Sequence, residues 1–526
     1  IYCGVAVFLF FLLYLACKKI SAKEKTVYCG LLLIFFASFS VNALNFIWHG
    51  LHYPNSLPCR QSFIYIFLML FVCFRAFQYL RDIPRRHVAA AFWGSVCFVI
   101  LAEKLVEQEH FHFAVYYVAI LFLAAYTGLI YLYKKRRREL AAFLALALVA
   151  VEAAVNTTVT SVTTTSREAY TRDNKEVQAL MEKLEPAEDF YRVEKKTRKT
   201  KNDGAWMNFP SVSLFSSTAN ADLTKFFKRM GCEASTNAYS ITGSTPLVDS
   251  LLSVRYALYS EYIPNTDLVN YIQESGGTYL YENPYTLPLG FVLPYDLADN
   301  WQYQMENPAE VQNDLCLLLG TDDVLVPVET EVSGSGCAFT ADMAGEYYVY
   351  IQNKKVKNVK ASLPSGEKNF SNVDRGYLLE MGNLSEGSRI TLTPGESGET
   401  LTAAVYRFSP RAMIQVHDRL SQSPLHLDSW RDTKLTGTVT AAESGTLFLS
   451  IPYDEGWTIT IDGQPAEGEK ILEAFLSVPV EAGTHEISLT YMPGGLIPGV
   501  VISGASAAVL VLLWIVKRRR PSQAGV

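Results

Sequence analysis

The sequence predicts a polytopic α-helical membrane domain, followed by a large extracytoplasmic region of α+β and β-sandwich type and one C-terminal transmembrane helix. Three observations lead to this fold class. Long apolar stretches are confined to the first 155 residues and the last 30. The loops between them alternate between basic and non-basic composition. From about residue 322 onward, apolar and polar residues alternate at period two between Gly-rich turns.

Chain length, net charge and the absence of certain motifs exclude several classes of protein. At 526 residues the chain is too long for one compact core. Its net charge of -6 and the lack of a basic stretch interleaved with aromatic residues argue against a nucleic-acid partner. GxSxG, P-loop and HExxH motifs are absent from the sequence. Function must therefore be sought in the arrangement around the membrane segments.

Six apolar stretches precede the polar middle of the chain, residues 156–494. A helix that crosses a bilayer core about 30 Å thick needs roughly 17 to 25 residues. The expected helices are Ile1–Cys17, Thr26–Leu44, Ser62–Leu80, Ala89–Leu105, Phe111–Tyr133 and Leu140–Val155, with a seventh at Leu496–Val516. Buried helices of a soluble protein are the alternative. The regular alternation of flanking charge argues against it.

The charged loops predict the orientation. "KKISAKEK", "RDIPRRH", "KKRRR" and the terminal "KRRR" are basic, whereas "NFIWHGLHYPNSLPCRQ" and "VEQEH" are not. By the positive-inside rule the basic loops are cytoplasmic, so residues 156–494 lie outside. Counting the alternating spans back from these loops also places Ile1 outside. We therefore expect an odd number of further helices upstream of Ile1.

The domain boundaries follow from composition and period. We expect six transmembrane helices in 1–155, an extracytoplasmic α+β domain in 156–305, a β-sandwich-like domain in 306–409, a second β-rich domain in 410–494, a transmembrane helix in 495–517 and a cytoplasmic tail in 518–526. In the α+β domain, "NKEVQALMEKLEP" and "ADLTKFFKRMG" have helical spacing, and "DFYRVEKK" and "SVRYALYSE" are typical of strands.

The nine cysteines of the chain include no CxxC pair. Export would allow Cys316 and Cys337 to form a disulfide.

The outward loops carry the residues suited to chemistry on a lipid-linked substrate. The first loop contains Trp48, His49, His52, Tyr53, Asn55 and Arg60. Arginine binds phosphate in a bidentate manner and histidine transfers protons, although Trp and Tyr also anchor helices at the headgroup level. The second loop contains Glu103, Lys104, Glu107, Glu109, His110 and His112. These carboxylates suit a metal or a sugar hydroxyl, but a polar turn has the same composition.

Several long motifs resemble the YfhO family of bacterial membrane proteins across nearly the whole chain. They are "HYPNSLPCRQSFIY", "NDGAWMNFPSVSLFSSTAN", "STPLVDSLLSVRYAL", "LPLGFVL", "IPYDEGWTITIDGQPAE" and "YMPGGLIPGVVIS". The resemblance implies a GT-C-type glycosyltransferase in the bacterial cytoplasmic membrane. Such an enzyme transfers a sugar from a polyprenyl-phosphate donor to a cell-envelope polymer such as teichoic acid on the outer face. It also implies an acidic catalytic residue in a first exported loop, upstream of Ile1.

The implied reaction assigns roles to residues of this chain. A leaving polyprenyl phosphate needs a nearby cation, for which we expect Arg60. His49 and His52 would donate to the phosphate or bind a divalent ion, Mg or Mn. The further candidates for the substrate cavity are Asn55, Glu103 and Glu107. Trp430 and Trp457 are candidates for stacking on sugar rings, with core packing the alternative for Trp457.

Two other functions fit part of the sequence. A non-catalytic, membrane-anchored protein that binds or assembles envelope glycans would need only one helix and no polar outward loops. A transporter would carry charged residues along its path. Arg75 and Glu152 are the main charged residues within the predicted helices, and either is placed to snorkel from near a helix end.

Overall fold

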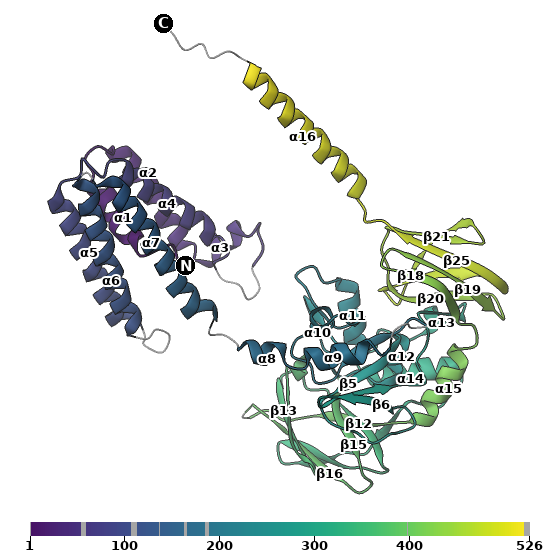
Figure 1. The fold of residues 1–526 in the computed structure, drawn as a ribbon. Coiled ribbons are helices and arrows are strands. Elements are labelled where there is room, and N and C mark those ends of the chain that lie inside the picture. Colours follow the sequence, from purple (N-terminus) through teal and green to yellow (C-terminus); the bar gives the residue numbers. More distant parts are fainter. Residues whose placement is uncertain are drawn as a thin grey trace. The chain divides into compact units, whose positions relative to one another are not determined.

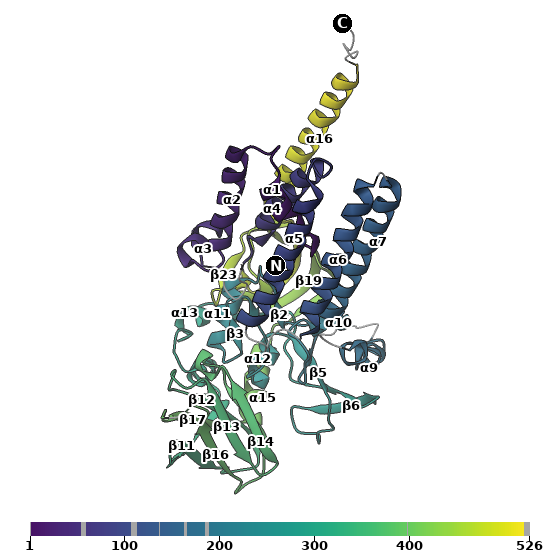
Figure 2. The same cartoon turned by 90° about the vertical axis from the view of Figure 1, so that its left-hand side faces the viewer.

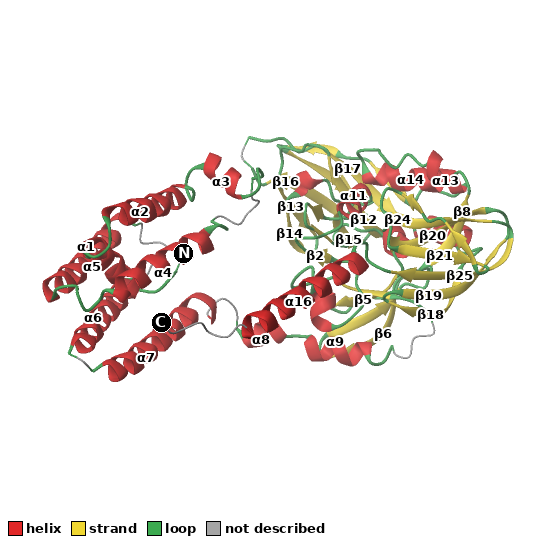
Figure 3. Cartoon of the chain, turned by 90° about the horizontal axis from the view of Figure 1, so that it is seen from above, coloured by secondary structure: helices red, strands yellow, loops and turns green. Residues whose placement is uncertain are grey.

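The chain divides into two compact units, Ile1–Tyr170 and Thr171–Val526. The computed structural model describes residues 2–53, 59–106, 113–135, 137–162, 166–184, 189–396 and 398–519. The described part of the first unit is helical, and the strands lie in the second (Figure 1, Figure 3).

The first unit is a bundle with apolar side chains both inside and outside. Its helices are α1 (Ala6–Ala16), α2 (Ala22–Ala37), α3 (Asn42–Trp48), α4 (Ser62–Gln78), α5 (Arg85–Leu105), α6 (Ala114–Lys134) and α7 (Arg138–Thr157). Leu9, Leu13 and Leu123 are fully buried in the core, whereas Phe63 and Trp93 are more than two-thirds exposed. Helices that are apolar on every side are typical of a membrane bundle.

Four helices in the described chain are long and apolar enough to cross a membrane. They are Arg85–Leu105, Ala114–Lys134, Arg138–Thr160 and Leu496–Lys517. α1 and α4 are shorter apolar helices. The predicted single helix Thr26–Leu44 is wrong, because α2 and α3 meet at an angle of 103°. The hydroxyl of Ser38 donates to the Ile34 carbonyl at 2.6 Å, a back-bond that often bends a helix.

The three basic loops of the first unit lie together. Lys19, between α1 and α2, pairs with Asp82, between α4 and α5, at 2.9 Å. The ammonium group of Lys134, at the end of α6, donates to the carbonyls of Leu80 (2.6 Å) and Ile83 (2.7 Å). The loops assigned to one side from their charge therefore share one end of the bundle.

The second unit begins with a four-stranded sheet. Its order is β1 (Arg192–Lys195), β5 (Val254–Tyr259), β7 (Thr278–Glu282) and β6 (Asn270–Ser275). The predicted amphipathic segments form α9 (Asn174–Met181) and α11 (Ala221–Arg229). The side chain of Asn220 caps α11 by accepting from Asp222 and Leu223 N–H groups. Val177 and Leu180 of α9 pack on this sheet in one small core.

Two antiparallel sheets then form a sandwich (Figure 2). One has the order β10 (Glu331–Ser333), β11 (Gly336–Thr340), β16 (Arg389–Pro394), β13 (Asn358–Leu363), β14 (Gly366–Ser371). The other has the order β15 (Leu379–Leu384), β12 (Gly345–Ile351), β17 (Ala403–Phe408), β9 (Leu325–Val328). Phe339 and Ile390 of the first meet Tyr347 and Val405 of the second in a shared core.

A second sandwich follows helix α15 (Pro410–Leu420). One sheet has the order β18 (Leu425–Arg431), β19 (Lys434–Ala441), β25 (Gly483–Tyr491), β21 (Trp457–Ile461), β22 (Gln464–Ala466). The other has the order β23 (Glu469–Ile471), β24 (Phe475–Val480), β20 (Gly445–Pro452), β8 (Gly290–Pro294). The edge strand β8 thus comes from the preceding α+β segment. The guanidinium of Arg192 also links these regions by donating to Ser450 Oγ at 2.9 Å.

Helices complete the second unit. α12 (Pro246–Leu251) and α14 (Pro308–Leu319) pack in its largest core, and α16 (Leu496–Arg519) follows β25. Cys316, on α14, and Cys337, on β11, are buried free thiols in different cores. The disulfide considered for this pair is therefore not formed.

Candidate functional site

The sharp turn between α2 and α3 is built around the hydroxyl of Ser38. This hydroxyl accepts a hydrogen bond from the indole N–H of Trp48 at 2.9 Å. The Trp48 ring stacks on Phe35, with the ring centroids 4.6 Å apart. The side-chain amide of Gln61 donates to the Ser38 carbonyl at 3.2 Å. These contacts hold α3 against the end of α2 and the start of α4.

His49 is the residue in this turn best placed for chemistry. Its Nδ1 lies 2.7 Å from the carbonyl oxygen of Asn45. A carbonyl only accepts hydrogen bonds, so Nδ1 must carry the proton. Nε2 is buried and has no partner among the described residues, and the same holds for Asn45 Oδ1 and Gln61 Oε1. Buried polar atoms normally have a partner, so this turn holds three hydrogen-bonding positions that the described residues leave unfilled.

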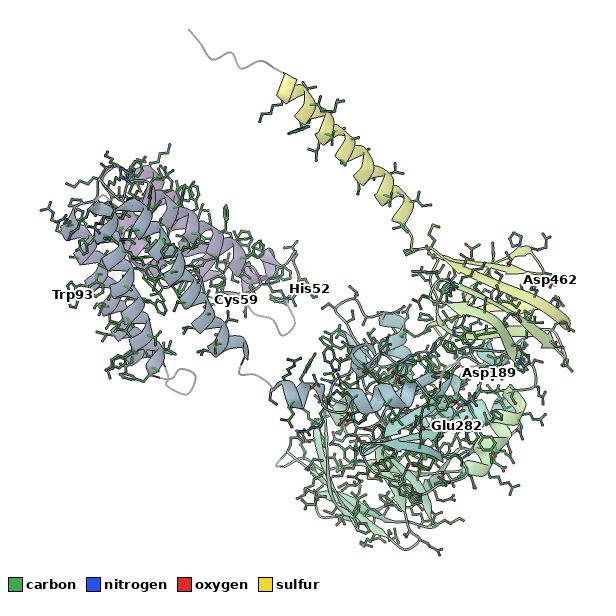
Figure 4. The ribbon with its side chains drawn as sticks, viewed as in Figure 1. His52, Cys59, Trp93, Asp189, Glu282 and Asp462 are labelled. Carbon is green, nitrogen blue, oxygen red and sulfur yellow. The ribbon has the colours of Figure 1, made fainter. Side chains whose placement is uncertain are left out.

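The turn lies at the end of the bundle opposite the basic loops. α2 begins beside the basic loop at Lys18 and Lys19 and leads away from it to α3. α4 starts directly after Gln61 and runs back to the basic end at Arg81. Figure 4 labels His52 and Cys59, which flank residues 54–58, at the α3 end of the bundle.

The structure brings some of the predicted site residues to this turn and leaves others apart. Arg60 directly precedes Gln61 and is exposed, as is His52. Glu103 lies in the last turn of α5 and pairs with Lys104 at 3.4 Å. Asn55 and Glu107 lie outside the described residues. Where the chain is described, no three His, Cys, Asp or Glu side chains are grouped to hold a metal ion.

Sequence reasoning missed three residues of the turn, Ser38, Asn45 and Gln61. The available signal was the polar interruption "SFSVN" at 38–42 inside an apolar stretch. Ser and Asn compete with helix hydrogen bonds through their own side chains, so such a run marks a break more often than a continuous span.

A second polar centre lies inside the bundle at Glu152 of α7, which is 6% exposed. One carboxylate oxygen accepts from the Tyr2 hydroxyl and from the Val5 backbone N–H, the latter at 2.6 Å. The other accepts from the Tyr126 hydroxyl. Glu152 therefore does not snorkel. Arg75 of α4 instead pairs with Glu24 of α2 at 2.8 Å near the basic end.

The two tryptophans proposed for sugar stacking are half-buried and pack against the core of the second sandwich. The Trp457 ring lies 4.9 Å from the Tyr491 ring, centroid to centroid. Trp430 lies on β18 next to the β18–β19 turn. Sugar stacking by either ring remains a prediction.

Comparison with known proteins identifies the family. The family model described as "Bacterial membrane protein YfhO" matches residues 1–325 and 329–503. The chain belongs to the YfhO family. A YfhO relative, the "Uncharacterized protein YfhO" of Bacillus subtilis (strain 168), is 29% identical over 93 residues. That match spans 18% of this chain and 11% of the relative.

The solved structures similar to this YfhO-family chain include the single-particle cryo-EM structure of the arabinofuranosyltransferase AftD from Mycobacteria. It is 9% identical, with a TM-score of 0.14, and the match covers 49% of this chain and 28% of that one. A likeness this weak carries no conclusion about fold or activity. The family match and the bundle geometry are what bear on function.

Proposed function

We propose that this YfhO-family chain is part of a membrane glycosyltransferase that moves a sugar from a polyprenyl-phosphate donor to an envelope polymer, such as a teichoic acid, on the outer face. The observation that carries the proposal is the α2–α3 turn, where His49 Nε2 is buried without a described partner at the end opposite the basic loops. The positive-inside rule makes that end the outer one.

In the proposed reaction an acceptor hydroxyl attacks the anomeric carbon. The bond from that carbon to the phosphate oxygen breaks, the polyprenyl phosphate leaves with the electron pair, and the hydroxyl proton passes to a base. The negative charge that develops on the phosphate favours a fixed cation and hydrogen-bond donors.

Arg60 supplies the cation, because a guanidinium presents two parallel N–H groups to a phosphate. His49 directs Nε2 toward the phosphate, while the Asn45 carbonyl holds its Nδ1–H and so orients the ring. His52, exposed on the same loop, is a second donor. Binding of a divalent ion by His49 and His52 is the other way in which this loop would neutralise the phosphate.

The proposal is tested by following sugar transfer from a synthetic polyprenyl-phosphate donor in proteoliposomes, with donor binding measured separately by photo-crosslinking. Arg60→Ala and His49→Phe are expected to lower transfer by about tenfold to a hundredfold, and Arg60→Lys by less. Arg86→Ala is the matched control, because Arg86 is an exposed arginine at the basic end. Full transfer and crosslinking in both site variants would exclude the assignment.

The alternative function is a non-catalytic protein that binds or assembles envelope glycans. It predicts no donor consumption by the wild-type protein and unchanged glycan binding in Arg60→Ala.

A further inference from the structure

A groove that contains several charged side chains runs between the β1–β5–β7–β6 sheet and the first sandwich, both within the second unit. Its central cavity has a volume of about 420 Å³, within the range of small-molecule sites. A cavity of about 200 Å³ shares Lys196, Lys368 and Glu380 with it. Another of about 280 Å³ shares Glu346 and Asn383. The two smaller cavities have no lining residue in common, so the central one lies between them and the groove is elongated.

Charged side chains from separate elements meet in the central cavity. Lys196, just after β1, lies 3.3 Å from Asp249 of α12. Burial acts to lower the pKa of Lys196, but the nearby carboxylates of Asp249 and Glu380 outweigh it and raise that pKa well above its usual value. Burial raises the pKa of Glu346 on β12, and the Tyr348 hydroxyl donates to Glu346 at 3.2 Å.

Two residues that line this cavity each have a buried polar atom without a partner among the described residues. Ser244 is 1% exposed, and its hydroxyl has no hydrogen bond. One carboxylate oxygen of Asp249 is bonded to Lys196, while the other is buried and free. An unsatisfied buried polar group is costly. A ligand that both donates and accepts hydrogen bonds would pair with both groups once their side chains turn toward the cavity.

The side chains that line the central cavity favour one class of ligand. The cavity is lined by carboxyl groups (Asp249, Glu282, Glu346, Glu380) and by cations (Lys196, Arg255, Lys368). Charges of both signs favour neither an anion nor a cation, while the carboxylates accept from hydroxyls and the cations donate to hydroxyl oxygens. Tyr256 and Tyr259 also line the cavity, and tyrosine rings provide apolar faces beside polar groups. A sugar ring has hydroxyls at its edge and C–H groups on its faces.

We propose that this groove binds a neutral glycan, with one sugar unit in the central cavity beside Ser244 and Asp249 and its neighbours in the flanking cavities. The inference rests on this groove alone and not on sugar transfer at the α2–α3 turn.

The test is saturation-transfer-difference NMR of the full chain in lipid nanodiscs, which avoids detergents with sugar headgroups. N,N′-diacetylchitobiose and maltose are the probes. We expect the wild-type protein to bind at least one of them in the millimolar range. Asp249→Asn is expected to weaken binding by about tenfold, and Ser244→Ala by at least threefold.

Ser244→Ala separates binding from folding. Its hydroxyl has no partner among the described residues, so the thermal midpoint is expected not to fall, while the dissociation constant for the sugar rises. Ser362→Ala, an exposed serine on β13 outside the groove, is the matched control and should leave both unchanged. Glu346→Gln gives a second variant of similar shape, expected to weaken binding.

Three results would overturn the proposal: no binding of either sugar by the wild-type protein, unchanged binding in Ser244→Ala and Asp249→Asn, or tighter binding of glycerol 3-phosphate or tetralysine than of both sugars. Arg60→Ala should bind the sugars normally, so loss of transfer and loss of glycan binding are distinguishable.

Discussion

The carboxylate of Glu152 accepts a 2.6 Å hydrogen bond from the backbone N–H of Val5, 147 residues earlier in the chain. Val5 immediately precedes α1, so its N–H is one of the groups that the helix itself leaves unpaired. The tyrosine hydroxyls at positions 2 and 126 donate to the same carboxylate. Glu152 thus joins α7, α6 and the start of α1 at one buried point.

Replacing Glu152 with Ala should lower the free energy of unfolding by about 3 kcal/mol, because three donors lose a buried, charged acceptor. Glu152→Gln should lower the free energy of unfolding by less than half as much, since its amide oxygen still accepts from the Val5 N–H. Thermal unfolding in nanodiscs measures both. Glu139→Gln, an exposed glutamate on the same helix, is the control, and wild-type stability in Glu152→Ala would refute the role.

Lys134 stabilises the basic end of the bundle through three carbonyl oxygens between Leu80 and Ile83. These carbonyls follow the end of α4, where a cation is favourable. Lys134→Met should therefore destabilise the protein by about 2 kcal/mol. Lys135→Met, an exposed neighbour, should change stability by under about 0.5 kcal/mol. Equal effects of the two substitutions in thermal unfolding would contradict this account.

Glu233 should make the second unit acid-sensitive. Burial acts to raise its pKa, but Lys201 (3.0 Å) and Arg198 (2.7 Å) outweigh it and lower that pKa below the usual value. The folded pKa then lies below the unfolded one, so the stabilisation is complete above the unfolded value near 4.5 and disappears as pH falls through the folded value.

The measurement is hydrogen exchange of peptides around β3 (Ala234–Ser235) and β4 (Ala238–Tyr239) between pH 7 and pH 3. Glu233→Gln should lose about 1 kcal/mol of protection at pH 7 and show a weaker loss on acidification than the wild type. Glu331→Gln removes an exposed pair with Arg389 and should behave as wild type. If protection against exchange falls equally with pH in Glu233→Gln and in the wild type, the predicted lowering of the Glu233 pKa is refuted.

Trp457 distinguishes core packing from sugar stacking. It packs against the second sandwich core and the Tyr491 ring, so Trp457→Ala should cost about 3 kcal/mol. Trp457→Phe should recover most of that and bind N,N′-diacetylchitobiose as the wild type does. Reduced sugar binding at unchanged thermal stability would instead favour stacking, which Trp430→Ala tests for the other ring.

Much of the architecture could be predicted from local patterns. Charge alternation correctly grouped the loops at Lys19, Asp82 and Lys134, because loops between successive spans must alternate between the two ends. Helical spacing located α9 and α11, since each needs only one apolar face. The helix break at Ser38 was missed because the prediction used the average hydropathy of the segment. That average does not contain the hydrogen bond from Ser38 to Ile34 that bends the chain.

The sequence by itself determined the membrane character, the family motifs and the period-two sandwiches, because these depend on composition and spacing along the chain. Only the tertiary structure decided that Ser38, Asn45, His49 and Gln61 form one turn with open hydrogen-bonding positions. It alone brought Lys196, Asp249, Glu346 and Glu380 into one groove. Such sites join residues far apart in the chain, and their partners are chosen by packing and by the need to satisfy buried polar groups, which no local pattern encodes.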